Sequence, residues 1–392
     1  MSADALKKEA CEAVDRMAPL LLRISREIHA RPELAFEERE AQALLVDALR
    51  GAGLEVEAGA YGLDTAFAAE FGAGECCVAL LAEYDALPEI GHACGHNLIA
   101  TAGVGAGLAL AGIATRLPGR VRVLGTPAEE RGCGKELMAR RGALDGVDAA
   151  MMIHPASVNL VTMPCVCLAE LDVGYRGEAA HAAAMPERGI NALDALVIAY
   201  QGVAALRQHI KPTERIHGII TDGGQAPNIV PERAAGRFYV RAATATELAA
   251  LKTRVEGCFR AGAEATGAEL DLRWGASDNL DIRFNEPLAE CFQRTAETLG
   301  REFFPIEKLP ASLQGSTDMG NVSQRVPSIH PMLAAAPLHC TIHNAEFARW
   351  AGSDLGDSAA IDGAKALAMT ALDFLSDPRL RERARLAFEA GG

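Results

Sequence analysis

The chain has no apolar run of transmembrane length that is free of glycine and charge. The nearest candidate, residues 102–113, is short and rich in glycine, and it predicts a packed core helix instead. The first residues lack the apolar core of a secretory signal, and the last residues carry no prenylation or retention motif. We therefore expect a cytoplasmic protein without a membrane partner.

An excess of positive charge is also lacking, since the 392 residues carry a net charge of −14. Binding to nucleic acid or to anionic membranes needs a basic surface, so neither partner is expected. Ten cysteines in a long chain without a secretory signal do not form a disulfide framework. Most of them should be small buried side chains.

Strand and helix patterns alternate along the first part of the chain. Apolar periodicity predicts helices at 5–31, 37–50 and 96–113, and strands at 64–71, 76–83, 121–125 and 147–153. This alternation is typical of an α/β fold with a mainly parallel sheet and helices on both faces. Ligands of such folds bind at the carboxyl ends of the strands.

The pattern changes near residue 168. Strands at 168–175, 215–222, 234–242 and 270–274 enclose helices at 190–209 and 246–265, which is the order of a ferredoxin-like α+β unit. We expect residues 168–278 to form a separate inserted domain. Residues 1–167 and 279–392 should then form one discontinuous domain, with helices at 286–299 and 357–375 and a strand at 326–332. Two domains suit a chain of this length.

One stretch, Glu83 to Asn97, places several polar groups at the end of a buried strand, where they need partners or a ligand. Within it, Cys94 and His96 are a plausible pair of metal ligands. Similar groups follow later strands or lie in the returning segment: Glu129, Glu130, His154 and His343. Each residue alone is more often a buried or solvated side chain, but their joint occurrence at strand ends favours a two-metal site.

Thiolate, imidazole and carboxylate ligands suit zinc, and manganese, cobalt or nickel also fit. In two-metal hydrolases the ions lie about 3.5–4 Å apart and share a water or hydroxide. One carboxylate of the Glu129–Glu130 pair could bind metal while its neighbour acts as a general base. His339 competes with His343 as the last ligand.

The motifs resemble those of metallopeptidase family twenty, the co-catalytic amidohydrolases of the aminoacylase type. The likeness is strongest to the branch that contains hippurate hydrolase, auxin-conjugate hydrolases and aminobenzoyl-glutamate hydrolases. The shared motifs span nearly the whole chain in the expected order: His29-Ala-Arg-Pro-Glu-Leu, Asp85-Ala-Leu-Pro, His92-Ala-Cys-Gly-His96, Glu129-Glu130, Ile153-His154, Ala180-His-Ala-Ala183, Asn228-Ile-Val-Pro231 and His343-Asn-Ala-Glu-Phe347.

The resemblance implies metal-dependent amide hydrolysis with two divalent ions, zinc or manganese above all. Cys94 would bridge the ions, and the remaining ligands would be His96, Glu130, His154 and His343. His343 is preferred to His339 because His-x-x-x-Phe matches the family motif. Glu129 would be the general base and proton shuttle, and Asp85 would orient a histidine ligand.

In the family, the inserted domain is a lid and a dimerisation module, so the resemblance also implies a homodimer. His181 and Asn228 lie on this domain and would bind the substrate carbonyl or the oxyanion. In some relatives that histidine reaches across from the partner subunit. Glu83 stands where many relatives outside this branch place a histidine ligand.

Three departures from the family pattern leave the substrate open. Only Glu89-Ile-Gly separates two motifs, Asn97 replaces an aspartate, and Ser316-Thr-Asp-Met-Gly replaces an acidic-aromatic motif. They favour the aminobenzoyl-glutamate and basic-dipeptide side of the branch, although N-acyl amino acids remain candidates. An arginine of the inserted domain, Arg241 or Arg233, could bind a substrate carboxylate through its guanidinium fork.

Two other functions remain as alternatives. Cys94 could be a catalytic nucleophile with His92 or His96 as its base, but the later Glu and His residues would then have no task. A non-catalytic scaffold protein could use a closed structural metal site with four ligands and no open position. Activity that needs about two loosely held ions per chain would exclude both alternatives.

Overall fold

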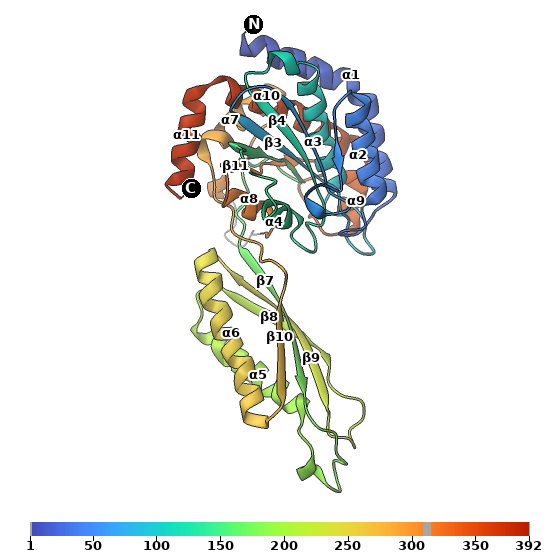
Figure 1. Cartoon of the computed structure of the whole chain (residues 1–392), viewed down its shortest axis with the longest axis vertical. Coiled ribbons are helices and arrows are strands. Elements are labelled where there is room, and N and C mark those ends of the chain that lie inside the picture. The colour runs from blue at the N-terminus through green and yellow to red at the C-terminus, as the bar shows by residue number, and fades with distance from the viewer. Residues whose placement is uncertain (1, 309–314, 392) are drawn as a thin grey trace. The chain divides into compact units, whose positions relative to one another are not determined.

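The computed structural model describes residues 2–391 except 309–314. The chain forms two compact units, one of Met1–Pro164 with Ile282–Gly392 and the other of Cys165–Asp281 (Figure 1). We call them the discontinuous unit and the inserted unit. The observed limits of the inserted unit lie three residues outside the expected limits, 168 and 278, at each end. None of the described helices is long and apolar enough to cross a bilayer.

The discontinuous unit is built on a six-stranded sheet with the order β1-β2-β4-β3-β5-β11. The strands are β1 (Glu57–Ala58), β2 (Phe67–Gly72), β3 (Cys77–Glu83), β4 (Arg120–Thr126), β5 (Ala149–Met151) and β11 (Ser328–Ile329). Strands β4, β3, β5 and β11 are parallel, whereas β1 and β2 are antiparallel additions at one edge. The predicted mainly parallel sheet is therefore confirmed.

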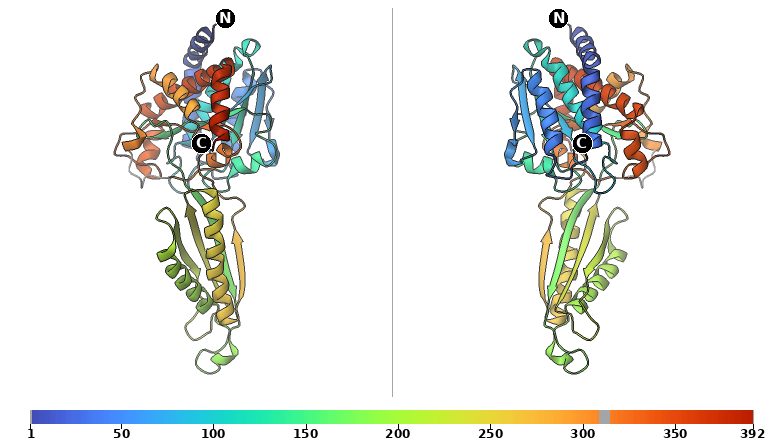
Figure 2. Two further views of the ribbon diagram at one scale, coloured as in Figure 1. Left: turned by 90° about the vertical axis from the view of Figure 1, so that its left-hand side faces the viewer. Right: turned by 90° about the vertical axis from the view of Figure 1, so that its right-hand side faces the viewer.

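One face of this sheet is covered by α1 (Ala3–Ala30), α3 (His96–Ala111) and α10 (Asp354–Ser376), which pack against one another (Figures 1 and 2). Helix α3 is buried along nearly its whole length, as predicted for a core helix. Its glycines allow close packing, because a Cβ on Gly103 would lie 2.5 Å from the Leu81 carbonyl oxygen. This contact sets α3, and the residues at its amino end, against the end of β3.

The remaining helices of this unit are α2 (Arg39–Gly51), α4 (Gly134–Ala139), α7 (Glu286–Glu297), α8 (Met319–Ser323), α9 (Ala345–Ala351) and α11 (Pro378–Glu389). Helix α4 and the following turn lie on the sheet face opposite α3. Val123 contacts α3, and its neighbour Arg122 points the other way to bind the carbonyl oxygens of Ala143 and Asp145. The sheet thus has helices on both faces.

The inserted unit is a four-stranded antiparallel sheet with the order β10-β7-β9-β8. Its elements are β7 (Cys167–Arg176), α5 (Ala192–Leu206), β8 (Arg215–Asp222), β9 (Arg233–Ala242), α6 (Ala245–Thr266) and β10 (Glu269–Trp274). Both helices pack on one face, where Phe238 of β9 meets Phe259 of α6 with ring centroids 4.9 Å apart. This is the predicted ferredoxin-like arrangement.

The strand predicted at 326–332 is wrong as a single element. Residues Ser328–Ile329 form β11, whereas β12 (Met332–Ala334) pairs with β6 (His154–Ala156) in a separate two-stranded sheet. Pro331 lies between the two strands and has no backbone N–H to continue the first ladder. For the same reason the strand predicted at 147–153 ends early, and His154 begins β6 instead of ending β5.

Candidate metal centre

The five predicted metal ligands lie together in the discontinuous unit. Cys94 and His96 stand at the amino end of α3, and Glu130 follows β4. His154 begins β6, and His343 precedes α9. The backbone N–H of His343 donates to the Ala93 carbonyl at 2.8 Å, which ties the loop before α9 directly to the Cys94 loop. Residues 250 positions apart in the chain thus become neighbours.

Backbone strain at this place is consistent with a functional site. Ala128 and His343 both have left-handed conformations, with φ of 62° and 64°. Non-glycine residues avoid this region unless surrounding contacts hold them there, and such residues gather at active and ligand sites. Gly95 also has a positive φ, and a Cβ there would lie 2.5 Å from the Pro155 ring, so the turn before His96 requires glycine.

The ligand atoms form two groups that share one member. The first group consists of Cys94, His96 and His154, and the second of Cys94, Glu130 and His343, each with its ligand atoms within 4.8 Å of one another. The Cys94 sulfur lies 3.4 Å from His154 Nε2 and 3.3 Å from His343 Nε2. The geometry therefore gives Cys94 the position of a bridge between two sites.

These residues fit divalent cations on two independent counts. Two ligands of one tetrahedral ion, with metal–sulfur and metal–nitrogen bonds of about 2.3 and 2.05 Å, lie about 3.5 Å apart, close to the distances around Cys94. In addition, His96 Nε2, Glu130 Oε1 and Glu83 Oε1 are buried and have no hydrogen-bond partner. A cation supplies the partner that these atoms lack.

Asp85 orients this cluster from behind. One of its oxygens lies 3.1 Å from His96 Nδ1, and the other accepts the Glu130 backbone N–H at 2.9 Å. Burial alone would raise the pKa of Asp85, but the hydrogen bond and charge of His96 outweigh it and hold the pKa below its usual value. Because Asp85 accepts the Nδ1 proton, His96 is left with Nε2 as its metal-binding atom.

The other two histidines are also in the form that binds metal. His154 Nδ1 donates to the Pro155 carbonyl at 2.7 Å, which leaves the Nε2 lone pair free. Burial, with the charge of His96 next, lowers the pKa of His154 to about 4, so its imidazole is neutral at pH 7. The pKa of His343 is lowered for the same two reasons.

Burial raises the pKa of the Cys94 thiol well above its ordinary value, and the Glu130 charge raises it further. A thiol in this state is a poor nucleophile, which argues against the alternative of thiol catalysis. Burial, followed by the charges of Glu83 and Glu130, likewise raises the pKa of Glu129. The pKa of Glu130 is raised to about 7, chiefly by burial. A positive ion at this place opposes all three shifts.

The two predicted lid residues are neighbours within the inserted unit. The Ala182 backbone N–H donates to the Asn228 carbonyl at 3.0 Å, which joins the loop of His181 to that of Asn228. His181 Nδ1 accepts the backbone N–H groups of Ala183 and Ala184 at 3.3 and 3.2 Å. The neutral ring then carries its proton on Nε2, and this exposed atom is a hydrogen-bond donor.

The two candidate arginines cannot bind the same carboxylate. Arg233 pairs with Arg176 at one end of β9, and Arg241 pairs with Leu168 at the other. At about 3.4 Å per residue, their eight-residue separation corresponds to about 27 Å. Arg241 is half-buried, and burial lowers the pKa of its guanidinium below the ordinary value. Its partly desolvated side chain remains the better candidate.

Two residues in the site were not predicted from the sequence. The Lys135 ammonium is buried between the carboxylates of Glu83 and Asp318. A lysine directly before the apolar turn of α4, within a glycine-rich segment, is the one sequence signal that points to it. In contrast, His339 is exposed and pairs with Glu346 at 3.3 Å, away from the two ligand groups.

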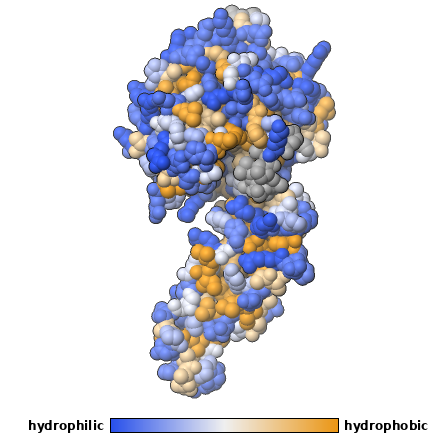
Figure 3. Space-filling model, turned by 180° about the vertical axis from the view of Figure 1, so that it is seen from behind, coloured by the Kyte–Doolittle hydropathy of each residue, from blue (hydrophilic) through white to orange (hydrophobic). Residues whose placement is uncertain are grey.

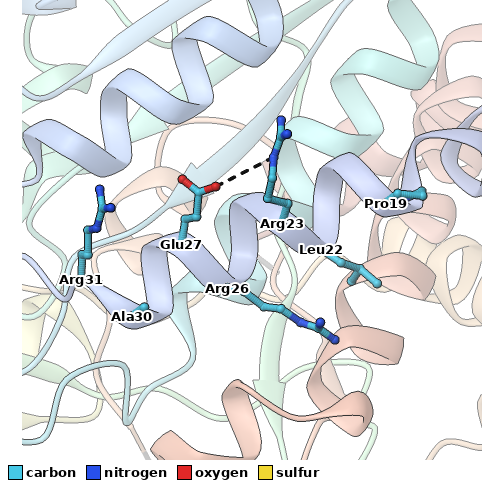
Figure 4. A pocket seen from close by; sticks show the side chains of 7 residues that line it. All are labelled: Pro19, Leu22, Arg23, Arg26, Glu27, Ala30 and Arg31. Carbon is cyan, nitrogen blue, oxygen red and sulfur yellow. Dashed lines mark ion pairs between the residues drawn. The ribbon is translucent and has the colours of Figure 1, made fainter.

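The most prominent surface hollow is not at this site. A hollow of about 480 Å³ runs along α1 and is lined by Pro19, Leu22, Arg23, Arg26, Glu27, Ala30 and Arg31 (Figure 4). Its charged groups are paired, with Arg23 facing Glu27 at 3.9 Å and Arg31 bonded to Glu40. It offers no group of metal ligands, so it carries no catalytic assignment.

Comparisons with known proteins agree with this geometry. Residues 79–367 match the family described as Peptidase family M20/M25/M40. The chain is 42% identical to a mouse Xaa-Arg dipeptidase, covering 98% of this chain and 92% of that protein. It is 35% identical to one of the two kinds of subunit of the Escherichia coli p-aminobenzoyl-glutamate hydrolase, over 64% of this chain and 56% of that protein. A dinuclear metal-binding M20 peptidase of Bacillus subtilis has a similar fold, with a TM-score of 0.69, 20% identity, and coverage of 92% of this chain and 99% of that one.

Proposed function

Because the chain belongs to peptidase family M20/M25/M40, and is therefore a metal-dependent hydrolase acting on C–N bonds, we propose that its substrates are dipeptides with a basic C-terminal residue. The observation that carries this choice is the 42% identity to an Xaa-Arg dipeptidase over nearly the whole of both chains. The likeness to the aminobenzoyl-glutamate hydrolase is lower and covers about two thirds of this chain. Membership of a hydrolase family removes the reason for a non-catalytic scaffold.

Two divalent ions, zinc or manganese, would be held by the two ligand groups, with Cys94 between them. When bound, such ions polarise a carbonyl and lower the pKa of a water. Glu129 accepts the proton of the attacking water and delivers it to the leaving amine nitrogen. Glu129 suits this exchange because it lies beside the ligands, in a group with His96 and Glu83, without belonging to either of the two ligand groups that share Cys94.

His181 stabilises the negative charge that develops on the scissile carbonyl oxygen. Its tautomer supports this role, because Nδ1 is occupied by two backbone donors and Nε2–H is exposed. Asn228, on the adjoining loop, assists in the same binding. Arg241 binds the substrate carboxylate, since a guanidinium fork matches its two oxygens.

A homodimer through the inserted unit accompanies this function. Strand β8 lies at the edge of its sheet, and its Ile219 and Ile220 are 64% and 43% exposed. Helix α5 exposes Val197 and Ile198, and Figure 3 shows hydrophobic side chains on the surface of the lower unit. Unpaired edges and exposed apolar patches are commonly covered by a partner. Ile219→Lys should therefore convert a dimer into a monomer in gel filtration.

The test of the function is a hydrolysis panel with metals added back. We expect Xaa-Arg and Xaa-Lys dipeptides to be cleaved faster than aminobenzoyl-glutamate and N-acetyl amino acids. Glu129→Gln should keep its bound metal but lower kcat by about 10²–10⁴-fold, the usual contribution of a general base. Glu75→Gln, an exposed change at the opposite end of β3, is the control. A preference for acidic amides would overturn the substrate, and retained activity in Glu129→Gln would overturn the base.

Mixing two inactive variants tells where His181 acts. If His181 serves the partner's site, a mixed dimer of Glu129→Gln and His181→Ala has one intact site, and activity returns. If it serves its own subunit, each site keeps one defect and the mixture stays inactive.

A further inference from the structure

The carboxylate of Glu83, at the end of β3, has two oxygens in different surroundings. Its side chain is buried, and one oxygen, Oε2, forms an ion pair with the Lys135 ammonium. The other oxygen, Oε1, is buried without a hydrogen-bond partner, although it lies 3.0 Å from His96 Nε2. A buried carboxylate oxygen without a donor is costly and calls for a partner.

The charges around Glu83 do not balance within the protein. The Lys135 ammonium also contacts Asp318 Oδ1 at 2.6 Å, and the other Asp318 oxygen accepts the Lys135 backbone N–H at 2.9 Å. All three side chains are buried, so one positive charge faces two negative charges. A buried charge without a counter-charge is strongly unfavourable. The Lys135–Asp318 pair is neutral by itself, and the Glu83 charge is left over.

The distance between Glu83 and His96 fits two ligands of one ion. Asp85 occupies His96 Nδ1, so Nε2 is the ring atom that binds metal, and Glu83 Oε1 faces this same atom at 3.0 Å. With metal–ligand bonds of about 2.0–2.2 Å, two ligands lie about 2.9 Å apart at a right angle and about 3.4 Å apart at a tetrahedral angle. The observed distance corresponds to an angle near 90°, as in five- or six-coordinate ions.

We propose that Glu83 Oε1 is a further metal ligand, on the same ion as His96, His154 and Cys94, an inference that rests on the dinuclear centre of the proposed function. Lys135, fixed by Asp318, holds the second Glu83 oxygen and keeps the carboxylate monodentate. The ion therefore gains an anionic ligand and keeps an open position for water. A glutamate that serves only as the counter-ion of Lys135 is the competing explanation, and it predicts no change in metal binding when Glu83 loses its charge.

Metal binding separates these two explanations without measuring turnover. Metal-free Glu83→Gln is titrated with Co²⁺ in competition with a chromophoric chelator, and its visible spectrum is recorded. We expect the affinity of one of the two ions to fall about 10–100-fold, with intensified visible bands because the ion has lost a ligand. The matched control is Glu136→Gln, a buried glutamate of α4 that pairs with Arg140 and Arg325 and belongs to no ligand group. Unchanged affinities and an unchanged spectrum in Glu83→Gln would overturn the proposal.

A second measurement needs no variant and covers the case in which Glu83→Gln does not fold. In a crystal of the wild-type protein loaded with Mn²⁺, anomalous scattering locates the ions. A Glu83 Oε1–manganese distance of about 2.1–2.2 Å is expected. A distance beyond about 3 Å, outside any coordination bond, would contradict the proposal. Because neither readout uses a substrate, failure of the proposed dipeptidase activity would leave these results interpretable.

Discussion

Replacing Asp85 by asparagine should weaken metal binding without removing any metal ligand. Asp85 is 1% exposed, and its two oxygens accept two different donors, the His96 ring N–H and the Glu130 backbone N–H. An asparagine has one acceptor oxygen in place of two. Its NH₂ group must then face one of these donors, so either the ring of His96 or the Glu130 backbone loses its hydrogen bond.

The expected loss follows from the kind of contact that is removed. Changing a group that orients a metal-binding histidine typically costs 10–100-fold in metal affinity, or about 1.4–2.7 kcal/mol. Asp85 supports a ligand of each ion, His96 for one and Glu130 for the other. The loss should therefore affect both ions, with the larger share on the ion whose ligand loses its hydrogen bond.

The assay is a competition titration of metal-free protein with Zn²⁺ or Mn²⁺ against a chelator of known affinity. Asp148→Asn is the matched control, because Asp148 also accepts a backbone N–H, that of Cys77 at 2.7 Å, at the opposite end of β3. The control should bind metal like the wild type. Unchanged metal affinity in Asp85→Asn would refute the reasoning that its two hydrogen bonds orient the ligands.

Three further predictions concern other parts of the chain. Cys94→Ala should weaken both ions, whereas His154→Ala should weaken one, because only Cys94 belongs to both ligand groups; metal analysis after dialysis decides. Burial raises the pKa of Glu38 from 4.5 to about 7, so its contribution to stability is complete below pH 4.5 and is lost as the pH rises through 7. Relative to Glu38→Gln, the wild type should lose about 3 kcal/mol across this interval in denaturant unfolding at fixed metal, and a pH-independent difference would contradict this. Phe238→Ala should destabilise the inserted unit by about 3–5 kcal/mol, since it removes a buried ring packed against Phe259, and a loss below about 1 kcal/mol in the same assay would show that this contact is not central.

Much of the fold follows from local patterns in the sequence. The run of β3 is apolar on both faces and is buried throughout, as expected for a central parallel strand. Where the expectation failed, a local signal had been overlooked. Pro331 divides the strand predicted at 326–332, and Asp377-Pro378, a typical helix start, begins α11, for which no helix was predicted.

The candidate site was only partly predictable, for a different reason. The strand ends and motifs point to the ligands, because the carboxyl ends of parallel strands converge in space. They do not reveal which polar side chains will pair across the chain. Lys135 and Asp318 are 183 positions apart, and only the packing of α4 against α8 brings them together. The left-handed backbone of Ala128 and His343 is likewise set by tertiary contacts, against their local preference.

The central claim is that amide hydrolysis depends on a dinuclear centre bridged by Cys94. The most direct test is to titrate the metal-free protein with Mn²⁺ or Zn²⁺ while measuring bound metal and hydrolysis of an Xaa-Arg dipeptide in parallel. We predict that activity appears as the ions bind and reaches its plateau when both ligand groups are filled, at two ions per chain. Full activity in the metal-free protein, or no hydrolysis of any amide with two ions bound, would contradict the account.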